Sequence, residues 1–469
     1  MLYNILVMTG VIMLNENFKR RMMGLLGDEY HQFIDRLENC DAVRGVRVNT
    51  LKCDIKSLDE AKFNLTPLDY AEDGFILSDG EGIGNTPEHH SGMIYVQDPG
   101  AMATVNALDI EPGWRVMDMC SAPGGKSGQA AAKIGSSGFI HSNEYVPKRA
   151  KIIVSNFERL GITNAVVTSL DTAELVRLYS EFFDLVIADV PCSGEGMFRK
   201  SGEAVSEWSE ENVIMCAERQ REIIKNAAPI VKPGGYLLYS TCTYSLEENE
   251  MVVDGFLSEN PDFELVKVKD ELCRVTSDGI VFDGAKNPKI KLCRRFYPHK
   301  SEGEGQFIAL MKRLGGSEKK QAILYKDASK PLTKDERSAI DKFFSENLVE
   351  IPDFRIVKHG ENIVILPHGY PIPPKSVFSA GVLLGEVTKG LVFPSHHFFT
   401  AYGKLFKRQE NLTRGGTKVQ KYLAGEEIDA EFSDNGWCAV LYEGVTLGGG
   451  KASSGKIKNH YPKGLRIKR

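Results

Sequence analysis

Residues 182–194 read FFDLVIADVPCSG and predict a buried β-strand that ends abruptly. The apolar run 185–188 is typical of a strand covered on both faces, as in a parallel α/β sheet. Because Pro191 prevents regular continuation, we expect Asp189 and Cys192 at the carboxyl end of the strand. Open α/β sheets bind their ligands at that edge. The stretch therefore predicts a site with an acid and a thiol, and by itself it favours Cys192 as a nucleophile.

A glycine-rich turn precedes this stretch. Residues 114–119 are a predicted strand, residues 120–126 (CSAPGGK) a turn, and residues 127–134 a helix of small side chains. Glycines at the start of a helix let a ligand approach the backbone N–H groups. The glycine spacing is not that of a P-loop, although Lys126 and Ser127 resemble the end of that motif. The turn therefore predicts a ligand site without a triphosphate.

Two further predicted strands end in carboxylates. Residues 138–144 end at Glu144 and residues 165–171 end at Asp171, with a basic amphipathic helix over residues 147–160 between them. In such sheets the first acid is placed to bind ribose hydroxyls, and the second can accept an adenine amino group. Each acid alone favours a solvated loop start, but their order and placement together favour a nucleoside ligand. No basic cluster faces a diphosphate, so S-adenosylmethionine fits better than a dinucleotide.

The alternation of strands and helices predicts a doubly wound, Rossmann-like α/β core. The fifth strand, YLLYSTCT, also ends in a cysteine, Cys242, so two thiols are expected at one edge of the sheet. The seven predicted strands cover residues 114–119, 138–144, 165–171, 182–189, 236–243, 263–268 and 306–311.

Composition limits the remaining possibilities. The net charge of −5 does not indicate a nucleic-acid binder as a whole, but after Glu443 there are basic residues and no acidic ones. That tail is either a solvated basic segment or an RNA-contacting face. The nine scattered cysteines fit neither a zinc site nor a disulfide scaffold, which predicts a cytoplasmic protein without a metal. No segment predicts a membrane span or signal peptide, and residues 1–12 are interpreted as an upstream-start extension.

Three motifs resemble, in chain order, those of the Nop/Sun RNA cytosine-C5 methyltransferases. They are CSAPGGK at 120–126, DVPCSG at 189–194 and STCT at 240–243. RVNTLK at 47–52 and YVQDP at 95–99 resemble the N-terminal motifs of that family. The resemblance covers nearly the whole chain from Met13, and it implies the class I S-adenosylmethionine-dependent methyltransferase fold.

Other motifs resemble the bacterial RsmF-type subgroup, which modifies 16S rRNA. They are PCSGEGMFRK at 191–200, YPH at 297–299 with GEG at 303–305, and KNHYPKG at 458–464. Ser121, where the family usually has Ala, and Gly449, in place of a common aromatic residue, are small departures. This resemblance implies the small ribosomal subunit or its 16S rRNA as partner. We expect a monomer that does not associate with a membrane.

The resemblance also implies a domain organisation. An N-terminal α+β RNA-binding subdomain is expected over residues 13–106 and the catalytic domain over residues 107–314. An intermediate accessory region over residues 330–400 precedes a small β-rich PUA-like RNA-binding domain over residues 401–469. Composition agrees with a boundary before residue 330, because residues 315–331 are polar and rich in turn formers.

The roles of individual residues come from the same resemblance. It implies that Cys242 attacks the base and that Cys192 assists product release, which moves the nucleophile away from Cys192. Asp189 is the candidate hydrogen-bond donor to N3 of cytosine. The expected contacts to S-adenosylmethionine are Cys120, Ser121, Ala122, Pro123, Gly124, Gly125, Lys126, Glu144, Arg149, Asp171 and Asp189.

These groups match what the reaction needs. C5 of cytosine is a poor nucleophile, and a thiolate that adds to C6 converts the ring into an enamine that accepts a methyl group at C5. Because the base must leave its stack, the substrate is single-stranded or locally opened RNA. Three alternatives remain: a tRNA substrate, a non-catalytic ribosome-assembly factor on the same fold, and, less well supported, a DNA cytosine methyltransferase.

Overall fold

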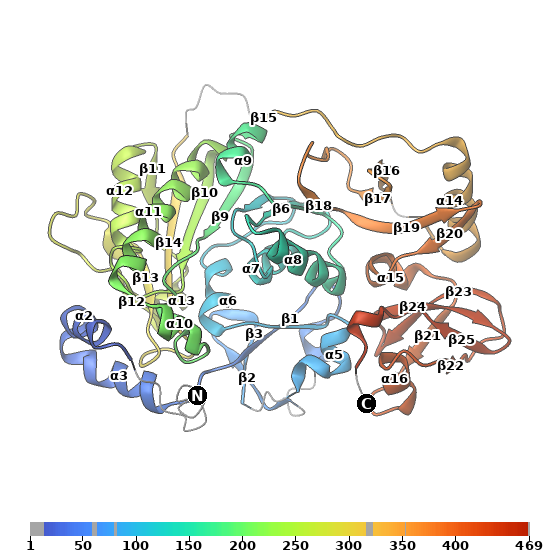
Figure 1. The fold of residues 1–469 in the computed structure, drawn as a ribbon, viewed down its shortest axis with the longest axis horizontal. Helices are drawn as coiled ribbons and strands as arrows, with labels where there is room; N and C mark the ends of the chain where they lie inside the picture. Colours follow the sequence, from blue (N-terminus) through green and yellow to red (C-terminus); the bar gives the residue numbers. More distant parts are fainter. Residues whose placement is uncertain (1–13, 59–62, 79–81, 316–321, 352, 468–469) are drawn as a thin grey trace.

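The structure is a computed structural model, shown as a ribbon in Figure 1. It describes residues 14–467 apart from 59–62, 79–81, 316–321 and 352. The predicted upstream-start extension, residues 1–12, lies outside the described residues. Within them, no helix combines the length and the apolar character that a membrane crossing requires.

A ten-stranded sheet forms the centre of the molecule (Figure 1). Its parallel strands are β5 (Arg115–Asp118), β6 (Phe139–Asn143), β7 (Ala165–Thr168), β9 (Phe183–Asp189) and β10 (Val231–Thr241). Strand β14 (Gln306–Arg313) runs antiparallel to β10. The other strands are β11 (Phe263–Leu265), β12 (Ser277–Asp278), β13 (Arg294–Phe296) and β18 (Val377–Ala380). The order is β12-β13-β14-β10-β9-β5-β6-β7-β18, with β11 also paired to β14.

Both faces of this sheet are covered, as the apolar run in β9 predicts. Val186 and Ala188 belong to one core cluster, with α9 (Thr172–Leu178), α11 (Glu210–Ala227) and α12 (Glu250–Glu259). Leu185 and Ile187 belong to the other, with α6 (Pro99–Val105), α7 (Gly125–Ile134), α8 (Pro147–Leu160) and α13 (Asp270–Val275). Because successive side chains of a strand point to opposite faces, one apolar run fills two cores. The doubly wound fold class is confirmed.

The predicted number of seven strands is wrong. All seven are present, and the structure adds β12, β13 and β18. Strand β13 pairs with the first part of β14, while β11 pairs with its last part, so one long strand serves two short ones. Strand β18 lies in the predicted accessory region and pairs with β7, Ala380 opposite Val166. It covers an edge that would otherwise expose unpaired backbone groups.

The N-terminal part has two helices and its own sheet. Helices α2 (Glu16–Leu26) and α3 (Tyr30–Asn39) bury Phe18 and Phe33 against Phe198, Trp208 and Tyr244. The antiparallel sheet has the order β2-β3-β1-β4, and α5 (Pro87–His90) precedes its last strand. Its strands are β1 (Gly45–Val48), β2 (Leu65–Leu68), β3 (Ala71–Leu77) and β4 (Ile94–Val96). The helix pair thus packs on residues that follow β9 and β10.

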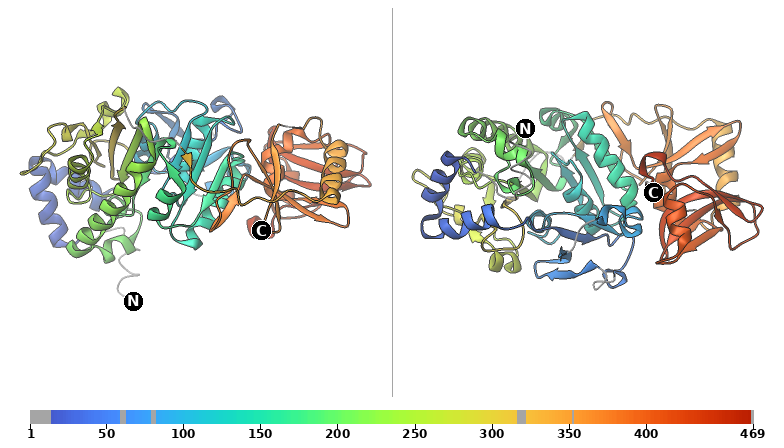
Figure 2. Two further views of the ribbon diagram at one scale, coloured as in Figure 1. Left: turned by 90° about the horizontal axis from the view of Figure 1, so that it is seen from above. Right: turned by 60° about the horizontal axis from the view of Figure 1, so that its bottom comes forward.

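The C-terminal part has two further sheets. The first contains β16 (Arg355–His359), β17 (Asn362–Leu366), β19 (Val382–Thr388) and β20 (Leu391–Pro394), beside α14 (Lys334–Asn347). The second contains β21 (Gln409–Leu412), β22 (Ile428–Asp429), β23 (Gly436–Tyr442), β24 (Val445–Ser453) and β25 (Lys456–Asn459), with α15 (His396–Tyr402) and α16 (Thr417–Leu423) nearby. A short ladder joins β15 (Ala322–Ile323) to β8 (Tyr179–Ser180), and α10 (Gly202–Glu207) precedes α11. Figure 2 shows α2 and α3 at one end of the molecule and these sheets at the other. The division into domains stays a prediction.

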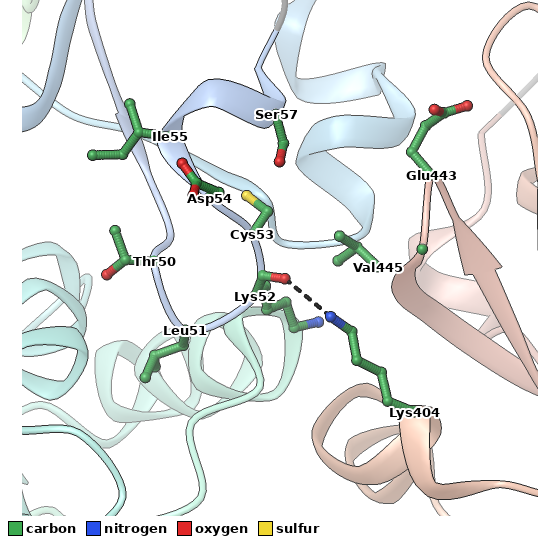
Figure 3. A pocket seen from close by; sticks show the side chains of 11 residues that line it. Thr50, Leu51, Lys52, Cys53, Asp54, Ile55, Ser57, Lys404, Glu443 and Val445 are labelled. Carbon is green, nitrogen blue, oxygen red and sulfur yellow. Dashed lines mark hydrogen bonds between the residues drawn. The ribbon is translucent and has the colours of Figure 1, made fainter.

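A buried lysine joins the N-terminal and C-terminal parts. The Lys52 ammonium donates to the carbonyl oxygens of Ser91, at 2.8 Å, and Thr446, at 3.2 Å. Figure 3 shows Lys404 donating to the Lys52 carbonyl at 3.4 Å, beside a cavity between the two parts. Burial lowers the pKa of Lys52 to about 7, with the charges of Arg159 and Lys404 acting in the same direction. The junction is therefore held by hydrogen bonds from the Lys52 amine to backbone carbonyls.

Gly92 marks the contact between the N-terminal part and α8. It has φ +73°, and a Cβ there would lie 2.0 Å from the carbonyl oxygen of Arg159. We expect Gly92→Ala to lower the free energy of unfolding by about 1–3 kcal/mol more than a Gly→Ala substitution at a similar φ with free space around it. The difference arises because the contact with Arg159 must also open. Thermal unfolding of the full chain measures this as a lower Tm.

Gly455→Ala is the matched control for that measurement. Gly455 has φ +74° and nothing within 4 Å of an added Cβ. Equal Tm values for the two variants would contradict the described contact between Gly92 and Arg159.

Candidate active site

The glycine-rich turn lies between β5 and α7, as predicted. Gly124, with φ 101°, is the N-cap of α7, and its N–H donates to the Ser121 carbonyl at 2.6 Å. The Ser121 N–H donates to the carbonyl of Asn143, at the end of β6. Burial raises the pKa of the Cys120 thiol well above its ordinary value, so that thiol stays protonated. The turn is thus tied to the next strand by its backbone, and Cys120 has no nucleophilic form near neutral pH.

Glu144 and Arg149 lie together beside this turn. Glu144 is buried and accepts the Val146 N–H at 3.0 Å, while its second oxygen is 3.5 Å from Arg149 Nη1. Arg149 Nη2 also donates to the carbonyl of Ala122, at 3.2 Å. The structure therefore brings the carboxylate after β6 and the basic residue of α8 to the turn after β5.

Asp171 is placed differently. It is exposed and forms the N-cap of α9, where its carboxylate accepts the Ala173 N–H at 2.9 Å. Asn143 donates to the carbonyls of Met119 and Leu170, so the ends of β5 and β7 are joined through one side chain. Asp171 thus follows a strand end that is fixed relative to the turn, with an established capping role of its own.

Asp189 links the turn to the two strands that carry the thiols. Lys126 Nζ lies 2.8 Å from one carboxylate oxygen, and Ser240 Oγ donates to the other at 2.7 Å. Burial disfavours the charged Lys126, but Asp189 outweighs that penalty and raises the lysine pKa. Ser240 is directly opposite Asp189 in the parallel register of β9 and β10. An ion pair is therefore held at the carboxyl edge of the sheet.

The two predicted thiols meet at the same edge. The Sγ atoms of Cys192 and Cys242 are 3.1 Å apart, and the Cys242 N–H donates to Cys192 Sγ at 3.3 Å. Both are free cysteines. The hydrogen bond with Cys242, together with burial, raises the pKa of Cys192 well above its ordinary value. Cys192 is therefore held as a thiol, which argues against it as the attacking thiolate.

The N-terminal motifs also reach the turn. A Cβ on Gly125 would lie 3.1 Å from the Tyr95 ring and 3.4 Å from the Gln97 side chain, so only glycine fits without displacement. Lys200 Nζ lies 2.6 Å from Asp98, which connects the same motif to the loop after β9. Within the described residues, no group of three or more His, Cys, Asp or Glu side chains is arranged to hold a metal ion.

Sequence reasoning missed several residues of this site. Ser240 was recognised only as part of the STCT motif. It lies two residues before Cys242, at the end of a predicted strand, and this position could have indicated that it shares a sheet edge with Asp189. Gln220 and Glu248 gave no signal, because they lie in segments that read as ordinary polar helix surface. In the structure both are fully buried beside the cysteine loops.

Comparisons with known families agree with this arrangement. Three family models match, described as 16S rRNA methyltransferase RsmB/F over residues 105–312, the N-terminal domain of 16S rRNA methyltransferase RsmF over residues 14–99, and the methyltransferase RsmF PUA domain over residues 410–467. The matches cover the N-terminal part, the central sheet except β18, and the second C-terminal sheet.

Individual relatives span the same extent. Ribosomal RNA small subunit methyltransferase F of Vibrio vulnificus (strain YJ016) is 31% identical over 442 residues, which cover 90% of this chain and 91% of that protein. The protein of that name from Klebsiella pneumoniae (strain 342) is 31% identical over 440 residues, with 90% of each chain covered.

Solved structures resemble the chain in part. A methyltransferase homolog from Pyrococcus horikoshii is 29% identical with a TM-score of 0.55, over 64% of this chain and 95% of its own. NSun6 from Pyrococcus horikoshii, at 20% identity and TM-score 0.55 over 64% of this chain and 99% of its own, shows the shared fold. The expected family resemblance is confirmed, and the chain belongs to the RsmF group of the 16S rRNA methyltransferase RsmB/F family.

Proposed function

We propose that this enzyme methylates C5 of a cytosine in 16S rRNA, giving 5-methylcytosine, through a covalent adduct between Cys242 and C6 of the base. The observation that carries the proposal is the pair of thiols 3.1 Å apart, at the same sheet edge as the Lys126–Asp189 ion pair. One thiol alone is compatible with a packing role, whereas two at a ligand-binding edge fit a two-step covalent reaction.

The residues present fit S-adenosylmethionine as methyl donor. The glycines in the turn at residues 120–126 let a ligand approach the backbone. Beside the turn lie a buried carboxylate, Glu144, and the guanidinium group of Arg149. These are groups suited to a nucleoside with an amino-acid tail and no phosphates. Cys120, Ser121, Ala122, Pro123, Gly124, Gly125, Lys126, Glu144, Arg149, Asp171 and Asp189 stay the proposed contacts. When bound, the cofactor supplies an electrophilic methyl group.

The side chains of this enzyme then divide the remaining work. The Cys242 thiolate forms the S–C6 bond, and the displaced electron pair makes C5 nucleophilic. The Lys126 ammonium interacts electrostatically with Cys242, and this interaction contributes to the raised pKa of the lysine. In the ion pair the proton is on Lys126, so Asp189 relays to N3 a proton that it takes from the Lys126 ammonium, which leaves a carboxylate beside a neutral amine. After methylation, water takes the C5 proton, the electron pair of that C–H bond restores the C5–C6 double bond as the S–C6 bond breaks, and N3 returns its proton to Asp189. Cys192 assists the release as a thiol that can hydrogen-bond to the departing Cys242 sulfur.

The two thiols have different predicted phenotypes. Cys242→Ala should abolish methylation and form no adduct, because no thiolate reaches C6. Cys192→Ala should still attack and should accumulate a covalent RNA–protein complex, which migrates slowly on a denaturing gel. Cys216→Ala, at a cysteine of α11, is the control and should turn over normally. Normal turnover by Cys192→Ala, or an adduct formed by Cys242→Ala, would refute the assignment of roles.

Glu144 is the most direct test of the cofactor site. Glu144→Gln should weaken the binding of S-adenosylhomocysteine by about 10–100-fold, since a charge-assisted hydrogen bond contributes about 1.5–3 kcal/mol. Isothermal titration calorimetry measures this constant. Glu111→Gln, at an exposed acid before β5 and hence near the opposite edge of the sheet, is the matched control. Equal affinities of the two variants would remove Glu144 from the cofactor site.

Exposed lysines support an RNA substrate. Lys451 and Lys458 are paired across β24 and β25, and Lys456 lies opposite Ser453 in the same ladder. All three lysines are exposed, so one strand pair of the C-terminal sheet presents several positive charges. We infer that this face contacts RNA backbone, that the enzyme acts as a monomer, and that it works in the cytoplasm, where its free cysteines stay reduced.

The choice of substrate is decided by comparing RNAs directly. We expect methyl transfer to purified 30S subunits or to protein-free 16S rRNA, and no transfer to tRNA transcripts, with 5-methylcytosine mapped in the product. Transfer to tRNA alone would establish the tRNA alternative. The absence of transfer to every RNA, together with no binding of S-adenosylmethionine, would establish the non-catalytic assembly factor.

A further inference from the structure

Two buried carboxylates connect the loops that carry the thiols. Glu248, in the segment after β10, accepts the N–H of Ser193 at 2.9 Å and its hydroxyl at 2.5 Å. Glu195, in the segment after β9, accepts the N–H of Tyr244 at 2.8 Å. Each loop thus supplies a carboxylate to the backbone of the other, and each bond lies within three residues of a thiol.

Glu248 is the better placed of the two to act on Cys192. Its side chain is fully buried, and Gln220 Nε2 is its third donor, at 2.7 Å. The same nitrogen of Gln220 also donates to the carbonyl of Pro191, at 3.0 Å. Cys192 therefore lies between two residues, Pro191 and Ser193, whose backbones are both held by this pair of side chains.

The two loops also approach each other closely. The N–H of Gly196 donates to the Cys242 carbonyl at 2.8 Å, and a Cβ on Gly196 would lie 2.9 Å from that oxygen. The hydroxyls of Ser193 and Thr243 are 2.9 Å apart. The contact between the thiols is therefore one part of a continuous hydrogen-bonded interface between the two loops. Glu248 accepts three of the hydrogen bonds at this interface.

The hydrogen-bond donors around Glu248 favour its ionised form, against the effect of burial. All three partners of Glu248 donate, and a carboxylate only accepts, so every donor is satisfied. Among the described residues, no lysine or arginine forms an ion pair with it, which is unusual for a buried acid. A glutamine there would offer one accepting oxygen and turn an N–H₂ group towards donors.

We propose that Glu248 is a positioning residue that holds the backbone around Cys192 so that this thiol can act on the adduct formed by Cys242. The inference rests on the proposed function, because it concerns the release step. Glu248 is fully buried, and its carboxylate is occupied by Ser193 and Gln220. It acts through Ser193, and its loss should therefore slow release more than attack.

The test compares formation and decay of the RNA–protein adduct in Glu248→Gln. We expect adduct formation within about twofold of wild type and release slowed about tenfold or more, as for a lost hydrogen bond to a charged group. The adduct should therefore accumulate on a denaturing gel, while the affinity for S-adenosylhomocysteine stays unchanged. A merely structural role would reduce formation, release and cofactor binding together, and that result would overturn the proposal.

Asp254→Asn is the matched control. Asp254 is a buried carboxylate on α12 that accepts the backbone N–H groups of Lys286 and Asn287, away from the thiols. It should release product at the wild-type rate. If Glu248→Gln does not fold, Ser193→Ala removes the bonded hydroxyl but keeps the Ser193 N–H bond to Glu248, and it should show a smaller slowing of release. Wild-type release by that variant would also overturn the proposal.

The outcome of Cys192→Ala separates the two levels of the account. If Cys192→Ala accumulates the adduct and Glu248→Gln does not, Cys192 keeps its role and only the positioning role of Glu248 fails. If Cys192→Ala does not accumulate the adduct, the assignment under the proposed function fails first.

Discussion

The register of two parallel strands is the constraint on which the site depends. Asp189 of β9 lies directly opposite Ser240 of β10, so the segments after both strands begin at the same height on the sheet. That alignment lets Ser240 bond Asp189 and brings Cys192 to Cys242. A shift of the register by one residue would turn Ser240 to the other face and separate the thiols. The pairing of β9 with β10 therefore determines the relative positions of the acid and the two thiols.

Burial then determines the protonation of the groups at this edge. Cys192 and Cys120 are held as thiols by burial and by their neighbours, and Lys126 is held as a cation by Asp189. Glu248 is different, because burial raises its pKa to about 7 against the effect of its donors. Glu248, which holds the loops together, is thus poised near neutral pH, as is Asp118 at the end of β5.

The sequence predicted the core because its signals are local. The apolar runs, the glycine-rich turn and the strand-end acids each occupy a few consecutive residues. The runs, the turn and Glu144 lie where expected, whereas Asp171 is exposed and caps α9. The predicted number of strands was wrong for two reasons. Strands β12 and β13 are too short to show an alternation of apolar and polar residues, and β18, which pairs with β7, is distant from it in the sequence. Glu248 was not predicted as part of the site, because the sequence around an acid in a polar segment does not indicate that tertiary contacts will bury it. The roles of the two cysteines came from family resemblance alone.

The most direct test of the account is to identify the sulfur that bonds to RNA. Wild-type enzyme is incubated with S-adenosylmethionine and a substrate RNA carrying 5-fluorocytosine, which blocks loss of the C5 substituent and traps the adduct. The complex is digested and analysed by mass spectrometry. The account predicts the nucleotide on the peptide that contains Cys242, with the peptide of Cys192 unmodified. A nucleotide on Cys192 would contradict the central claim.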